Sequence, residues 1–214
     1  MITRLKFTDQ DNSKLFVTGC PHLNHNPQWK ENKIWETRGY SSAEEMTTGI
    51  IRQINDTCLA TDTLLVLGDF CLNTTPEQFY SLIHRIHPKL WFIRGNHNNP
   101  WEKLYLQHCI EKFGYEVIGY EWLDKITYLG DYAEINWNKT MFVCNHYPYY
   151  IWNDIKHGFI SLVSHSHGSC KLSRPEDKTM KQIDTGWEVW KKPISFREII
   201  QCSNKKQIFK GDHH

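Results

Sequence analysis

Five short polar blocks, each placed directly after an apolar run, constrain the fold of this chain more than any other feature. The run Thr63–Leu67 shows the pattern, because it leads straight into Gly68 and Asp69. In an open α/β sheet, ligands bind where the carboxyl ends of the strands meet. Core packing does not explain such a recurrence, so we expect the blocks to form one site. The blocks are Gly19-Cys20-Pro21-His22, Gly68-Asp69-Phe70, Gly95-Asn96-His97-Asn98, Asn145-His146-Tyr147-Pro148 and Ser164-His165-Ser166-His167.

The first half of the chain alternates between apolar runs typical of strands and amphipathic stretches typical of helices. Ser41 or Ser42, followed by acidic residues, can cap a helix, and Pro76 can start the next one. Strands are expected at residues 15–18, 63–67 and 89–93. This alternation predicts a parallel sheet of the α/β class.

The second half differs, because its strands follow one another with fewer helices between them. Strands are expected at residues 126–136, 140–144 and 159–164. The first two would be antiparallel, joined by a turn at Asn138 and Lys139, and a short helix would begin near Ser195. The whole pattern predicts an α/β fold of two packed mixed β-sheets flanked by helices, in one domain spanning residues 1–214.

Charge and cysteine content argue against several classes of partner. The 214 residues include 25 basic and 24 acidic side chains, so there is no electrostatic case for a nucleic-acid or anionic-membrane partner. The longest clean apolar run, Leu64–Leu67, is far shorter than the roughly 20 residues that span a bilayer. The first residues lack a secretory signal, and seven cysteines without a C-x-x-C pair are typical of reduced thiols. We therefore expect a cytoplasmic protein.

The order of the blocks resembles the calcineurin-like metallophosphoesterase family, whose pattern is D-x-H, G-D-x, G-N-H-[DE], an isolated His and G-H-x-H. The resemblance runs from about Phe16 to Ile200. It is closest to small phage and bacterial members that open with T-S-D-x-H-F-G-H, where this chain has Thr18-Gly19-Cys20-Pro21-His22-Leu23-Asn24-His25. The resemblance implies the family's αββα sandwich and places His25 near the site.

The resemblance also implies a centre for two divalent transition-metal ions, drawn from Zn, Fe, Mn or Ni. Asp69 would bridge the two ions, and His97 would act as a proton donor beside the phosphate. The other ligands would be Cys20, His22 and His167 at the first ion and Asn96, His146 and His165 at the second. Two such ions hold a hydroxide and clamp the oxygens of an in-line displacement.

Three positions depart from the family pattern. Cys20 stands where an Asp is expected, Asn98 where an acid follows G-N-H, and Ser164 where a Gly precedes the paired histidines. A thiolate is a softer ligand than a carboxylate, so Cys20 favours Zn or Fe at the first site; otherwise it is a small core residue. Asn98 removes an acid that would support His97, and Ser164 would alter the backbone before His165.

Two classes of function remain open at this point. The first is metal-dependent hydrolysis of a small phosphoester, monoester or diester, by a metal-activated hydroxide with His97 as general acid. Tyr147, Tyr149 and Trp152 could stack on the base of a nucleotide or cyclic nucleotide, although packing of their loop is the simpler explanation. The second class is a binding protein, non-catalytic or weakly active, with its first site degraded at Cys20. The neutral charge disfavours a nuclease.

Overall fold

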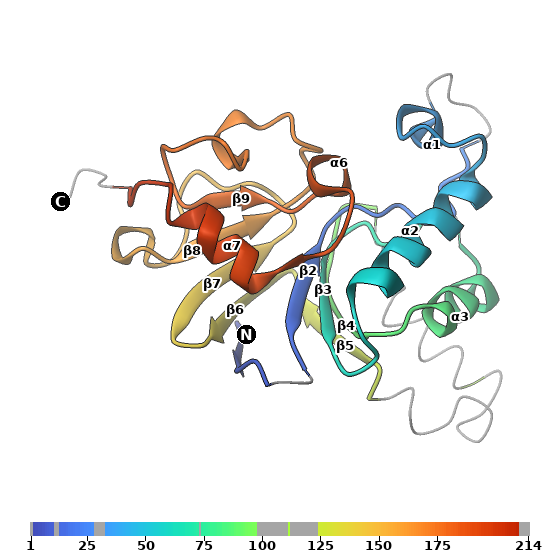
Figure 1. Ribbon diagram of the computed structural model, residues 1–214, viewed down its shortest axis with the longest axis horizontal. Helices are drawn as coiled ribbons and strands as arrows, with labels where there is room; N and C mark the ends of the chain where they lie inside the picture. Colours follow the sequence, from blue (N-terminus) through green and yellow to red (C-terminus); the bar gives the residue numbers. More distant parts are fainter. Residues whose placement is uncertain are drawn as a thin grey trace.

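Two five-stranded β-sheets form the body of the molecule, as the computed structural model shows (Figure 1). The structure describes residues 2–10, 13–27, 33–72, 74–97, 111 and 124–209, so Asn98 and its expected role lie outside the described residues. The first sheet has the order β1 (Thr3–Phe7), β6 (Tyr132–Trp137), β7 (Thr140–Asn145), β8 (Ile160–Val163) and β9 (Gln182–Asp184). The second has the order β10 (Ile194–Ser195), β2 (Leu15–Thr18), β3 (Thr63–Leu67), β4 (Lys89–Ile93) and β5 (Ile126–Gly130).

Both sheets are mixed, which confirms the predicted fold class. Strands β2 to β5 are parallel, and β10 pairs antiparallel with β2. In the first sheet only β6 and β7 are antiparallel neighbours, whereas β7, β8 and β9 run parallel. The second half of the chain is therefore richer in parallel pairing than its succession of strands predicts.

The longer described helices begin where the sequence supplies a capping side chain. The described helices are α1 (Ile34–Thr37), α2 (Ala43–Thr57), α3 (Pro76–Arg85), α6 (Trp187–Trp190) and α7 (Phe196–Ser203), with 3-10 turns at Ile155–His157 and Lys171–Ser173. The Ser42 side chain accepts a hydrogen bond from the Glu45 N–H at the start of α2, and Thr75 and Ser195 form capping boxes at α3 and α7. None of these helices is long and apolar enough to cross a membrane.

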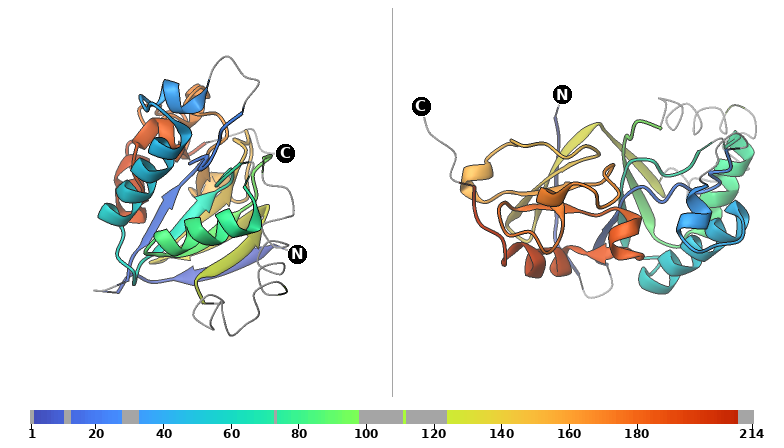
Figure 2. Two further views of the ribbon diagram at one scale, coloured as in Figure 1. Left: turned by 90° about the vertical axis from the view of Figure 1, so that its right-hand side faces the viewer. Right: turned by 90° about the horizontal axis from the view of Figure 1, so that it is seen from above.

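Strands β2 and β3 are buried on both faces, which explains their continuous apolar sequences. Alternate residues such as Val17 and Leu65 belong to the core between the two sheets. The intervening residues, including Phe16 and Val66, pack under α2 and α3, which lie together on the outer side of the second sheet (Figures 1 and 2). These layers hold the carboxyl ends of β2 and β3 in fixed positions.

The predicted strand at 126–136 is wrong as a single element, because the run divides between the sheets. Gly130 has a φ of +86° and ends β5, which pairs with β4. The next residues form β6 between β1 and β7. Glycine adopts positive φ at little cost, so it allows the chain to leave one sheet and enter the other within two residues.

The carboxyl ends of the parallel strands of both sheets meet at one edge of the molecule. Gly19, after β2, donates its N–H to the Thr185 carbonyl beyond β9 at 2.9 Å. The His146 ring, after β7, lies 2.9 Å from the Leu67 carbonyl of β3 through its Nδ1 atom. These contacts join the two sheets where the five polar blocks lie.

Candidate metal centre

Four ligand side chains converge around His146, which follows β7. Its Nε2 atom lies 2.8 Å from Asn96 Oδ1, 3.1 Å from His165 Nδ1 and 3.5 Å from Asp69 Oδ2. The four residues follow β7, β4, β8 and β3, so four strand ends supply one cluster. Imidazole, amide oxygen and carboxylate are ligands that suit a divalent transition metal. This cluster contains the residues expected at the second ion.

The residues expected at the first ion form an adjoining cluster. His22 Nε2 lies 3.3 Å from His167 Nε2 and 3.9 Å from Asp69 Oδ2. The ligand atoms of Cys20, His22 and His167 all lie within 4.8 Å of one another. Those of Cys20, Asp69 and His146 do so as well. Asp69 thus faces both clusters, as a bridging carboxylate must, and the thiol of Cys20 lies beside both.

His97 lies at the solvent side of this centre. The backbone N–H of His97 donates to Asp69 Oδ1 at 3.0 Å, and His97 itself is exposed to solvent. The centroid of its ring is 5.8 Å from that of His22. A side chain in this position can meet a phosphoester that approaches from solvent, which is the place expected for a proton donor.

Backbone strain is concentrated at the candidate ligands. Among the described residues, ten that are not glycine have positive φ, and five of them are candidate ligands. These are Cys20, His22, Asp69, His165 and His167, with φ between 48° and 52°. Left-handed conformations at such residues persist only where the surrounding structure enforces them, and they cluster at functional sites. The loops after β2, β3 and β8 are therefore held in shapes that serve the side chains.

Two glycines of the blocks are required by close packing around Asp69. A Cβ atom on Gly95 would lie 2.1 Å from Asp69 Oδ1 and 2.5 Å from Asp69 N. A Cβ atom on Gly68 would lie 2.4 Å from His146 Nδ1, and Gly68 has a φ of +82°. Any other residue at these positions would displace a ligand.

The two buried imidazoles are neutral, and that of His146 is oriented to bind metal through Nε2. His146 Nδ1 faces two oxygens, the Leu67 carbonyl at 2.9 Å and Ser164 Oγ at 3.0 Å, so Nδ1 carries the proton and Nε2 keeps its lone pair. Burial lowers the pKa of His146. Burial, together with the positive charge of Arg38, lowers the pKa of His22 well below its ordinary value. Neutral imidazole is the form that coordinates a metal.

The thiol of Cys20 has the opposite tendency. It is fully buried, and burial, followed by the negative charge of Asp69, raises its pKa far above the ordinary value. The sulfur is therefore a thiol in the absence of a cation, and a bound ion must displace its proton to form a thiolate ligand. The side chains of this centre fit the two ions that the sequence implies, with this one proton to be released.

Two acidic residues support the paired histidines, and sequence reasoning did not assign a role to either. Asp184 is buried and accepts hydrogen bonds from Ser166 Oγ at 2.6 Å and from the Gly168 N–H at 3.0 Å. Glu188 Oε2 lies 3.0 Å from His167 Nδ1. Both are distant in sequence from the loop that they hold, and no motif marks them.

Ser164 occupies space that a glycine at position 19 leaves open. A Cβ atom on Gly19 would lie only 2.3 Å from Ser164 Cβ and 2.9 Å from Ser164 Oγ. The two neighbouring loops therefore have room for a serine at only one of these two positions. The Ser164 hydroxyl, which donates to the Leu67 carbonyl, also holds His146, a role that the sequence did not predict.

The residues that flank the centre divide between surface and core. The His25 ring lies 5.4 Å from that of His22, near the site as expected. Tyr147 is 41% exposed and packs on His165 with ring centroids 4.6 Å apart, and Tyr149 is 47% exposed. Trp152, in contrast, is buried and packs its loop onto the first sheet.

A double sheet with carboxylate, imidazole and amide side chains gathered at one strand edge is an arrangement that suits metal-dependent hydrolases. The sequence matches the profile of the calcineurin-like phosphoesterases over residues 13–200. The chain belongs to this family.

One solved structure supports the fold alone. It is the crystal structure of AQ665, a protein of unknown function from Aquifex aeolicus, which is 20% identical in sequence with a TM-score of 0.53. The similarity covers 89% of this chain and 99% of that one. No curated protein matches the sequence.

Proposed function

We propose that the protein hydrolyses a small phosphoester with two divalent transition-metal ions held by the seven ligands described above. The observation that carries the proposal is the shared position of Asp69, whose Oδ2 atom lies near a donor atom of each cluster, 3.9 Å from His22 Nε2 and 3.5 Å from His146 Nε2. When bound, the ions would supply Lewis acidity and lower the pKa of water. Six of the seven ligand positions keep the residue type of the family, which favours an enzyme over a binding protein.

The chain's own residues exclude water, protonate the leaving group and offer a surface for the rest of the substrate. The buried loops after β2 and β3 exclude water from behind the metals, because Cys20, His22 and Asp69 are all nearly inaccessible. His97 is free on the open side to protonate the leaving oxygen. The exposed ring of Tyr147, which packs at an interplanar angle of 59° against His165, offers a flat apolar surface beside the metals. A nucleotide or cyclic nucleotide, which pairs a phosphoester with a planar base, suits this combination.

The direct test is to measure the metal content of protein purified without added metal and its turnover on a panel of phosphoesters. We expect about two ions per chain and hydrolysis of at least one nucleotide or cyclic nucleotide. Bound metal with no turnover on any monoester or diester would favour the alternative, a binding protein on the same fold.

Replacing His97 by alanine should leave both ions bound and slow hydrolysis. Protonation of a leaving group contributes about 10²–10⁴-fold, so substrates with alkoxide leaving groups should lose that factor. Activated aryl esters need little protonation and serve as the internal control, since their rates should change much less. Equal rates for wild type and variant on an alkyl phosphoester would remove His97 from this role.

Replacing Cys20 by aspartate should change which metal the first site prefers. A thiolate favours Zn or Fe, so these ions should copurify with the wild type, whereas Cys20→Asp should bind Mn better and keep or raise activity. Cys20→Ala should lower occupancy of the first site and leave the Asn96, His146 and His165 site filled. Metal analysis of the three proteins side by side checks this. Unchanged metal content in Cys20→Ala would show that the thiol is only a packing residue.

A further inference from the structure

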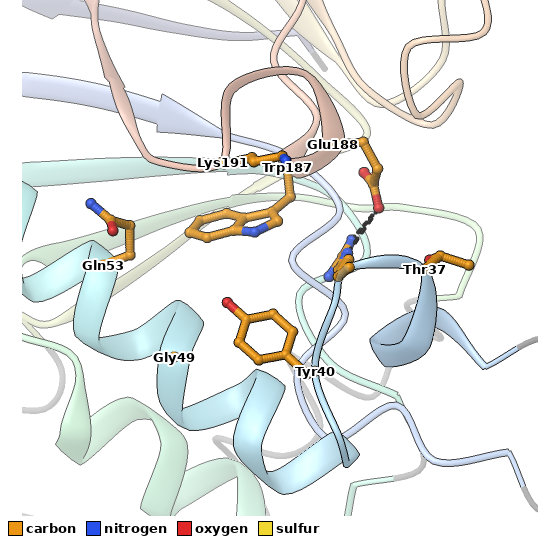
Figure 3. Close-up of a pocket in the computed structure, with 8 residues that line it drawn as sticks. Thr37, Tyr40, Gly49, Gln53, Trp187, Glu188 and Lys191 are labelled. Atoms are coloured by element: carbon orange, nitrogen blue, oxygen red, sulfur yellow. Dashed lines mark hydrogen bonds and ion pairs between the residues drawn. The ribbon is translucent and has the colours of Figure 1, made fainter.

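A partly buried ion pair joins the two loops that carry the first ion's expected ligands. Arg38 follows α1, and Glu188 lies in α6. Arg38 donates from Nε and Nη2 to Glu188 Oε1 at 2.9 Å and 2.5 Å, and the pair is drawn in Figure 3. The other carboxylate oxygen, Oε2, lies 3.0 Å from His167 Nδ1. One carboxylate therefore connects a guanidinium to a candidate ligand.

The same guanidinium holds the loop after β2. Arg38 Nη2 donates to the Cys20 carbonyl at 2.8 Å, and Nη1 donates to the Pro21 carbonyl at 2.6 Å. Cys20 and His22 have the positive φ values described above, so this loop needs outside support. The ligands that belong only to the first site come from two loops, after β2 and after β8. Arg38 and Glu188 together contact both loops.

We propose that Arg38 and Glu188 are positioning residues that fix Cys20, His22 and His167 for the first ion. The proposal rests on the metal-binding function proposed above. Glu188 Oε2 lies 3.0 Å from His167 Nδ1, so the carboxylate favours the tautomer that carries the proton on Nδ1 and leaves the Nε2 lone pair toward His22 Nε2 at 3.3 Å. Arg38 holds that carboxylate in place and fastens the carbonyls of the neighbouring loop.

Replacing Glu188 by glutamine should change which nitrogen of the His167 ring carries the proton. The amide of glutamine has only one acceptor oxygen, and Arg38 carries donors alone, so Arg38 would take that oxygen. The NH₂ group would then face His167 Nδ1 and make it an acceptor. The proton of the neutral imidazole would move to Nε2, the atom needed for the ion.

The first experiment follows this proton in metal-free protein. In ¹⁵N NMR spectra at a pH where the imidazoles are neutral, we expect His167 to carry its proton on Nδ1 in the wild type and on Nε2 in Glu188→Gln. His146, whose Nδ1 faces Leu67 and Ser164, should keep the Nδ1 proton in both proteins and is the internal control. An unchanged His167 tautomer would overturn the proposal. This readout needs no bound metal, so it stands apart from failure of the proposed function.

The second experiment measures metal affinity by titration with Zn²⁺ and Mn²⁺. Loss of a partner that orients a metal ligand typically lowers affinity about 10–100-fold, and Glu188→Gln should show this loss for the first ion only. Glu134→Gln is the control, because Glu134 is likewise a carboxylate paired with an arginine, Arg4, but lies on β6 and, among the described residues, pairs with no candidate ligand. Equal affinities in Glu188→Gln and Glu134→Gln would overturn the proposal.

The third experiment uses the pocket beside the ion pair. Arg38 and Glu188 line a pocket of about 310 Å³ with Tyr40, Trp187 and the exposed Lys191 (Figure 3). Arg38→Ala should lose first-ion affinity, and guanidinium added to the solution can enter from this pocket to restore it. Urea, planar but uncharged, is the control at equal concentration. Rescue by neither solute, or by both equally, would contradict a positioning role for the guanidinium charge.

Discussion

Replacing Asp69 by asparagine is expected to empty both metal sites and to reduce phosphoester hydrolysis to background. One carboxylate oxygen, Oδ2, lies near both His22 and His146, so its charge serves both ions. Asparagine tolerates the left-handed conformation of position 69, where φ is +50°, and its oxygen can still accept the His97 N–H. The variant therefore removes the charge and keeps the shape. Asp69→Ala should behave in the same way.

The measurement is metal content per chain, combined with thermal unfolding in the presence and absence of metal. An ion that binds only the folded state stabilises it by about 2.7 kcal/mol at a free concentration of about 100 times Kd. For a chain of this size, that corresponds to a rise in Tm of roughly 5–11 °C. Wild type should show the rise, and Asp69→Asn should not. Two ions and normal rates in Asp69→Asn would refute the whole cluster as a catalytic centre.

Replacing Gly19 by serine is expected to destabilise the protein strongly unless Ser164 is replaced by glycine at the same time. The new Cβ atom would lie 2.3 Å from Ser164 Cβ, and overpacking of this kind costs about 1–3 kcal/mol or more. In the double variant the clash is absent, so most of the lost stability should return. A coupling of about 1–3 kcal/mol is expected from urea unfolding of the four proteins.

Gly130→Ala combined with Ser164→Gly is the control, since a Cβ atom on Gly130 would meet nothing within 4 Å. The two effects should add. Metal affinity distinguishes the loss of packing from the loss of ligand orientation. Ser164→Gly removes one acceptor of His146 Nδ1, whether or not Gly19 is also replaced by serine. Ser164→Gly and the double variant Gly19→Ser with Ser164→Gly should therefore both bind the second ion more weakly than wild type. If the effects of Gly19→Ser and Ser164→Gly on the free energy of unfolding simply add, the steric conflict between these two positions is refuted.

The sequence predicted the parts of the fold that depend on local apolar pattern. Strands β2, β3 and β4 and the starts of α2, α3 and α7 lie where the apolar runs and capping residues place them. Strand β1 (Thr3–Phe7) was not predicted, because its residues alternate between exposed and half-buried and it pairs with β6, more than 120 residues away. Pairing at that distance leaves no local signal. The division of 126–136 between two sheets is likewise a tertiary effect.

The candidate ligands were predictable because each follows a strand and carries a chemical identity that packing does not need. The residues that hold these ligands in place could not be predicted from the sequence. Glu188 acts through a contact with His167, and Arg38 through the carbonyls of Cys20 and Pro21. A carbonyl partner imposes no residue type on the position that it contacts. Such roles can be assigned only once the loops are placed in space.

The contact between positions 19 and 164 also limits the order in which a gene could acquire this arrangement. A chain with serine at both positions would place two Cβ atoms 2.3 Å apart, whereas glycine at both leaves only a small gap. A lineage that starts from serine at 19 and glycine at 164 can therefore reach the present pair through the double-glycine intermediate, but not through the double-serine one. Along that route Gly19 comes first, and Ser164, with its hold on His146, follows.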